Sequence, residues 1–159
     1  MSNFCSDGDW IVLFCSNFDD SNLDSAHPDF IPADEIRVAA VNTVGNCHKF
    51  LQIPDEKFAP KDVTDIKAKD KKVVGLFEDG QVIVWDLISG VIVYQFDSEI
   101  RRLDSGSSGF IQSFSPSCDE IILNQHFNYS ETENELSVWR RSSQPERFRD
   151  TRIKSSDLE

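Results

Sequence analysis

Short apolar runs separated by turn-forming residues follow one another along this chain. Three of them, each as long as a β-strand, are residues 73–77, 82–87 and 91–96. Asp79-Gly80 separates the first two runs, and Ser89-Gly90 separates the last two. Asp-Gly between apolar runs favours a hairpin, because the preferred two-residue turns need a positive φ that glycine adopts without strain. Residues 63–66, followed by turn-forming residues 69–72, add a preceding strand, so the pattern predicts a four-stranded antiparallel meander.

The same order of apolar runs and turn-forming residues occurs twice more along the chain. Phe114 falls at the position of Ile66 when the later copy is aligned, and that copy comprises residues 111–117, 121–123 and 136–139. An earlier copy comprises residues 4–13, 35–38 and 47–53. The chain is therefore predicted to be all-β, with three units at approximately residues 3–54, 62–97 and 110–150. An immunoglobulin-like or other β-sandwich is the alternative, because it also shows apolar runs separated by turns.

Trp85-Asp86 closes the third strand of the second unit. With this pair, the unit resembles a WD-repeat, the four-stranded blade of a β-propeller. The resemblance implies an incomplete ring of about three antiparallel blades over residues 1–150. It also gives the pair a structural role, in which Asp86 accepts hydrogen bonds from backbone N–H groups in the turn beside its own strand.

The other units depart from the family pattern. Trp139 is followed by Arg140 where the family has Asp, and Ala39-Ala40 replaces the pair in the first unit. None of the three histidines lies in the loop before an innermost strand, where many WD-repeats carry Gly-His. The blades are therefore expected to rest mainly on apolar packing between sheets.

Three units fall short of a closed propeller, which usually has four to eight blades. Closure removes exposed sheet edges, so either the sequence belongs to a larger propeller or another chain completes the ring. The first unit favours a truncated propeller, because its innermost strand would have to lie in residues 1–5, too few to contain it.

Composition indicates a folded intracellular protein, cytoplasmic or nuclear. Apolar residues make up 39% of the 159 residues, with 12 Phe and 3 Trp, so the chain can bury a sizeable core. It shows neither a signal-peptide pattern nor an apolar run long enough to cross a bilayer. The four cysteines lack paired metal-ligand spacing and are expected to be free thiols. A net charge of −12 argues against nucleic-acid binding by bulk electrostatics.

One long acidic segment, residues 18–35, separates the second and third strands of the first unit. Loops of this length without structure of their own are often functional or disordered. We expect a partner-binding loop here, whose apolar anchors would be Phe18, Leu23, Phe30 and Ile31. Residues 151–159 are expected to form a disordered polar tail.

No motif in the sequence marks a catalytic or cofactor site. There is no phosphate-binding glycine loop and no G-x-S-x-G nucleophile elbow, and residues 20–31 fail the EF-hand pattern. We therefore expect a non-enzymatic, cofactor-free protein-interaction module or scaffold subunit, as the WD-repeat resemblance implies. The alternatives are a substrate receptor of a cullin–RING ubiquitin ligase and a fragment of a propeller-based enzyme. The arginine that often marks such receptors is replaced by Ile88.

Overall fold

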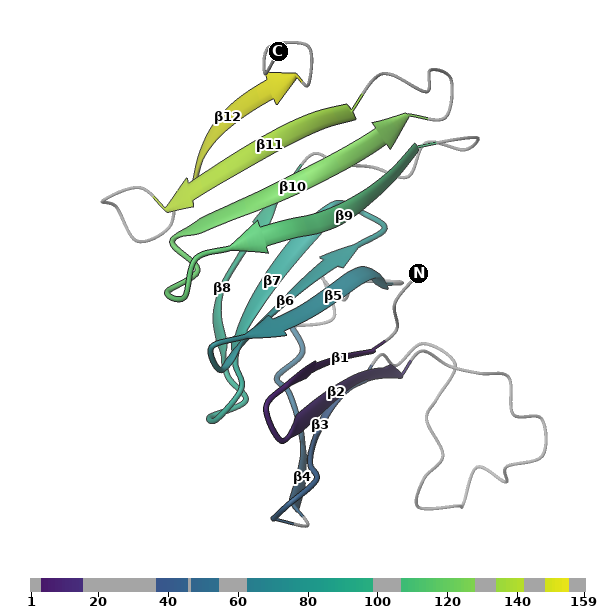
Figure 1. The fold of residues 1–159 in the computed structure, drawn as a ribbon, viewed down its shortest axis with the longest axis vertical. Coiled ribbons are helices and arrows are strands. Elements are labelled where there is room, and N and C mark those ends of the chain that lie inside the picture. Colours follow the sequence, from purple (N-terminus) through teal and green to yellow (C-terminus); the bar gives the residue numbers. More distant parts are fainter. Residues whose placement is uncertain are drawn as a thin grey trace, which may run out of the picture.

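The structure is a computed structural model that describes residues 4–15, 37–45, 47–54, 63–98, 107–127, 134–141 and 148–154. Within these ranges the chain forms three antiparallel four-stranded sheets and no helix. The sheets follow one another as layers along the long axis of the molecule (Figure 1). The predicted all-β architecture of three meanders is confirmed.

Each sheet is a simple up-and-down meander in chain order. The first sheet contains β1 (Phe4–Asp7), β2 (Trp10–Cys15), β3 (Arg37–Asn42) and β4 (Cys47–Phe50). The second contains β5 (Val63–Lys69), β6 (Lys72–Phe77), β7 (Gln81–Asp86) and β8 (Ile92–Asp97). The third contains β9 (Ser107–Phe114), β10 (Glu120–Phe127), β11 (Asn134–Arg141) and β12 (Phe148–Lys154).

Some element bounds differ from the prediction. The first sheet does contain its innermost strand, because β1 pairs with β2 over four residues. This strand runs to Asp7, so the expectation that it would have to lie within residues 1–5 is wrong. β3 begins two residues later than the predicted third strand and runs on to Asn42. β12 extends to Lys154, so residues 151–154 belong to the third sheet and not to a disordered tail.

The alignment of the innermost strands needs a shift of two residues. Phe114 occupies the position of Ala68 and not that of Ile66, because Phe114 and Ala68 each pair with the second residue of the next strand. The reason is the β9–β10 connection, which is longer than the two-residue turn Asp70–Lys71. Since the shift is even, the side chain keeps the predicted face of the sheet.

The second sheet is buried on both faces. Alternate side chains of β6 point to opposite sides, with Val73 and Phe77 in the core shared with the first sheet, and Val74 and Leu76 in the core shared with the third. This explains why β6 and β7 read as continuous apolar runs rather than as alternating patterns. Each such side chain, when fully buried, contributes about 1.5–3 kcal/mol to folding.

Hydrogen bonds also join the second and third sheets. The buried carboxylate of Asp65 accepts a hydrogen bond from the backbone N–H of Ile111 at 2.8 Å, and the Lys67 ammonium donates to the carbonyl of the same residue. On the outer part of the junction, the Tyr94 hydroxyl donates to the Cys118 carbonyl. These polar links fix the relative position of two sheets that apolar packing alone would leave free to slide.

Gly75 in β6 leaves room for two aromatic rings in the core between the first and second sheets. A Cβ atom at this position would lie 3.0 Å from Cζ3 of Trp85 and 3.1 Å from Cε2 of Phe77. Both rings are fully buried and lie edge-to-face, with centroids 6.3 Å apart. A side chain larger than hydrogen therefore cannot be added here without moving a packed ring.

We predict that Gly75→Ala lowers the free energy of unfolding by about 1–3 kcal/mol through overpacking. Gly45→Ala is the matched control, because its new Cβ would have no neighbour closer than 3.4 Å, and we expect a change within about 0.5 kcal/mol. Urea denaturation followed by tryptophan fluorescence measures both. Equal stabilities of the two variants would contradict the packing described here.

Candidate protein-interaction surface

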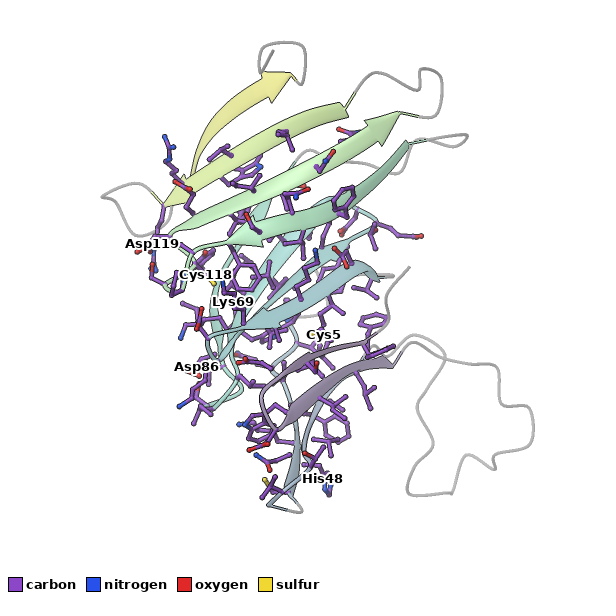
Figure 2. The ribbon with its side chains drawn as sticks, viewed as in Figure 1. Cys5, His48, Lys69, Asp86, Cys118 and Asp119 are labelled. Atoms are coloured by element: carbon purple, nitrogen blue, oxygen red, sulfur yellow. The ribbon has the colours of Figure 1, made fainter. Side chains whose placement is uncertain are left out.

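The connections β1–β2, β3–β4, β5–β6, β7–β8 and β9–β10 lie at the same end of their strands, along the left and lower margin of the view (Figure 1). We call this end the hairpin rim; it consists of residues 8–9, 43–45, 70–71, 87–91 and 115–119. Figure 2 shows the labelled side chains of Lys69, Asp86, Cys118 and Asp119 along this margin. The rim brings together turns from all three sheets.

One backbone hydrogen bond recurs at the rim in every sheet. The first residue after the third strand, or the last residue of that strand, donates its N–H to a carbonyl in the first hairpin. The three bonds are Thr43 N to Asp9 O at 2.8 Å, Leu87 N to Lys71 O at 2.9 Å and Arg141 N to Asp119 O at 2.8 Å. The rim backbone is therefore held in the same way three times.

The β5–β6 turn has an unusual backbone, because both Asp70 and Lys71 are left-handed, with φ of 51° and 61°. Positive φ at both central residues is the geometry that a two-residue hairpin needs, but a residue other than glycine adopts it at a cost. The carboxylate of Asp7 in the first sheet offsets this cost by accepting a hydrogen bond from the Lys71 N–H at 2.7 Å. The turn is thereby tied to the neighbouring sheet.

Asp86 closes the β7–β8 turn with its side chain. Its Oδ1 accepts hydrogen bonds from the backbone N–H groups of Ile88 at 2.9 Å and Ser89 at 3.4 Å. Its neighbour Trp85 is fully buried and donates from Nε1 to the Gln52 carbonyl of the segment after β4, at 2.7 Å. The Trp-Asp pair thus holds one turn and one junction between sheets, and Trp85 is not exposed to a partner.

The equivalent pair in the first sheet is Val41-Asn42, not Ala39-Ala40. Strand pairing decides this, because Asn42 lies opposite the first residue of β2 as Asp86 lies opposite the first residue of β6. Asn42 Oδ1 accepts hydrogen bonds from the N–H groups of Val44 at 3.0 Å and Gly45 at 2.7 Å. The Asp86 arrangement is therefore reproduced with an amide oxygen.

In the third sheet the position of Asp86 is taken by Arg140, as the sequence indicates. Its Nε lies 2.9 Å from Oε2 of Glu120 across the strand pair. Both side chains are largely exposed, so this ion pair contributes little to stability. At this position the third sheet has an ion pair between two strands, where the other two sheets have a side-chain oxygen that accepts hydrogen bonds from turn N–H groups.

The two turns held by Asn42 and Asp86 present apolar side chains at equivalent places. Val44 is 75% exposed and Ile88 is 53% exposed, each two residues after the side chain that fixes its turn. Around them lie charged rim residues of both signs, including Asp9 and Lys71, which are exposed. The result is a fixed surface in which apolar tips stand among mixed charges.

The anchors predicted in the acidic segment, Phe18, Leu23, Phe30 and Ile31, lie outside the described residues. Val44 and Ile88 were not singled out from the sequence. The sequence does contain a pattern that marks them, because at both turns an Asn or Asp is followed two positions later by a β-branched residue. Recognising it requires the correct strand register, which the Ala39-Ala40 alignment did not have.

The Cys118 thiol is buried and the Cys5 thiol is partly buried. Burial, followed by the nearby Asp65 and Asp7 carboxylates, raises the pKa of Cys5 to about 12. Burial also raises the pKa of Cys118 to about 11, although the Lys72 ammonium opposes this shift. Cys47, in contrast, is exposed. Within the described part of the chain, no three His, Cys, Asp or Glu side chains gather into a group that could hold a metal ion.

The comparisons with known proteins bear on the fold alone. No protein-family model and no curated protein matches the chain. Among solved structures, KlHsv2 with loop 6CD replaced by a Gly-Ser linker matches 92% of this chain with a TM-score of 0.56 and 9% identity. The chain spans 41% of that propeller. The fold is β-propeller-like. Its ring is not closed.

A second solved structure, the N-terminal domain of Nup159, matches 93% of this chain and 36% of its own length, with a TM-score of 0.48 and 12% identity. None of the described residues forms a helix long and apolar enough to cross a bilayer. The three described sheets correspond to three blades of a β-propeller-like fold whose ring is not closed.

We predict that Asp86→Ala lowers the free energy of unfolding by about 1–2 kcal/mol, because two turn N–H groups lose their acceptor. Asp86→Asn should stay close to the starting protein, since an amide oxygen already does the same work at Asn42. Chemical denaturation of both variants tests this. Equal losses in the two variants would assign the effect to charge and not to the turn.

We also predict that iodoacetamide at pH 8 alkylates Cys47 at least about 10-fold faster than Cys118, because the raised pKa leaves little reactive thiolate at a buried sulfur. Peptide mapping by mass spectrometry separates the sites. In urea the two rates should converge. Equal rates in the folded protein would show that Cys118 is accessible.

Proposed function

We propose that this chain is a non-catalytic protein-interaction module of the WD-repeat type, and that it binds partner proteins through the hairpin rim. The supporting observation is the repeated presentation of Val44 and Ile88 on turns that Asn42 and Asp86 hold rigid. A rigid turn loses little conformational entropy on binding, so apolar tips on it contribute more to affinity than the same tips on a mobile loop.

The junction between the first and second sheets supports the same proposal. The Lys49 ammonium donates to the Ile88 carbonyl, and Gln52 binds the second sheet through both backbone and side chain. These contacts tie β4 and the segment after it to the β7–β8 turn, so the rim turns of the first two sheets are held by one junction. A partner that binds across this junction would have its orientation selected by the flanking charges.

The mixed charge of the rim suits proteins better than nucleic acid. Exposed Asp9, Asp70 and Asp119 stand among Lys69 and Lys71, and the chain as a whole carries a net charge of −12. Phosphate backbones need a basic surface. We therefore propose other proteins as the partners, in the cytoplasm or nucleus, with the module serving as a scaffold subunit of a larger complex.

The test is affinity capture from a lysate with quantitative mass spectrometry. We expect the Val44→Ser/Ile88→Ser double variant to lose stoichiometric partners by about 10-fold or more, as truncation of central apolar contacts does. Val93→Ser is the matched control, because this valine is also exposed but lies within β8, outside the rim residues 87–91. Equal recovery of partners by both variants would refute the rim, and turnover by a partner-free chain would refute the non-catalytic role.

A further inference from the structure

One row of side chains across the outer face of the first sheet is apolar. Strand pairing places four side chains in this row: Phe4, Leu13, Ala39 and Phe50. Phe4 is 63% exposed and Phe50 is 56% exposed. The opposite face of the same strands carries Val12, Phe14, Val38 and Ala40, all buried in the first core.

The equivalent face is covered in the other two sheets. Ile11 on the outer face of the first sheet corresponds to Val73 and Ile121, because each is the second residue of its strand. Val73 is fully buried against the first sheet, and Ile121 is fully buried against the second. In this repeat, therefore, the face carrying Ile11 is the one that a preceding sheet covers.

The outer face of the third sheet shows the converse. Its residues Ile122 and Leu136 correspond to Val74 and Val82 of the second sheet, which the third sheet buries completely. On the third sheet these positions stay partly exposed, and Phe110 beside them is 37% exposed. This is the face that a following sheet covers elsewhere in the chain.

One polar atom on the outer face of the third sheet has no hydrogen-bond partner among the described residues. It is Oδ1 of Asn124, which lies two residues after Ile122 in β10 and pairs with Leu136 of β11, and this oxygen is buried. The corresponding residue of the second sheet is Leu76, inside the core. A covering sheet that brings a donor would satisfy this acceptor.

We propose that a second copy of this chain covers both faces. The outer face of the first sheet of one copy packs on the outer face of the third sheet of its partner. The twofold axis repeats this contact, so the third sheet of the first copy packs in the same way on the first sheet of the partner. The two faces match in kind, because each is the counterpart of one already packed inside the chain. Each copy thus places a sheet against the first and the third described sheets of the other.

The number of sheets selects a second copy among homo-oligomers. The described residues of one chain form three sheets, and closed propellers contain about four to eight. Two copies give six sheets, within this range, whereas one copy gives too few and three copies give too many. The contact is head-to-tail, so a closed ring with two such contacts leaves no apolar end face to recruit further chains.

The test measures the mass of the full chain by size-exclusion chromatography with light scattering. We expect a particle of about twice the 18.1 kDa of one chain. Leu13→Arg, on the first outer face, and Leu136→Asp, on the third, should each give a monomer with unchanged circular dichroism. Ile88→Ser, on the rim, should remain a dimer, which separates this proposal from the proposed function.

Mixing distinguishes a head-to-tail contact from other arrangements. An equimolar mixture of the Leu13→Arg and Leu136→Asp chains regains one contact between two unaltered faces, and its second contact pairs Arg with Asp. We therefore expect dimers from the mixture and monomers from each chain alone, which also shows that both variants fold. A monomeric starting protein, a dimer that survives Leu136→Asp, or a mixture that stays monomeric would each overturn the proposal.

Discussion

Burial of both faces of the second sheet is the interaction on which the rest of the structure depends. β6 and β7 send alternate side chains into two separate cores, so each neighbouring sheet has an apolar surface to pack against. A single meander of such a repeat cannot bury its apolar faces alone and needs a neighbouring sheet to cover them. The sheets are thus mutually dependent, and stability accumulates from one interface to the next, as in other repeat architectures.

Apolar packing sets the order of the sheets, but polar contacts set their alignment. Each junction contains backbone groups bound by side chains from the neighbouring sheet, such as Ile111 by Asp65 and Lys71 by Asp7. A hydrogen bond tolerates only a small displacement of its donor and acceptor. These contacts therefore prevent one sheet from sliding along the next, which hydrophobic burial alone would permit. The same alignment fixes the turns of the hairpin rim.

The tryptophans at equivalent positions of the second and third sheets differ in whether the indole N–H has an acceptor among the described residues. Trp85 is fully buried and donates to the Gln52 carbonyl, whereas the Trp139 ring packs on Phe96 with centroids 5.0 Å apart and the ring planes tilted by 34°. Its Nε1 is buried without an acceptor among the described residues, a cost of about 1–3 kcal/mol. The tryptophan N–H is therefore hydrogen-bonded at the junction between the first and second sheets, and it has no acceptor among the described residues at the junction between the second and third.

The sequence by itself determined the strands, the turns and their repetition. Period and turn chemistry are local, so Asp79-Gly80 and the run around Trp85 predicted the second sheet, and the hydrogen bonds of Asp86 follow the role that the family resemblance implied. Only the tertiary structure decided register across the repeat. Loop length shifted the innermost strands by two residues, and pairing placed Asn42 where the alignment had Ala40. It also decided which apolar faces are covered, because burial depends on a neighbouring sheet that no local pattern specifies.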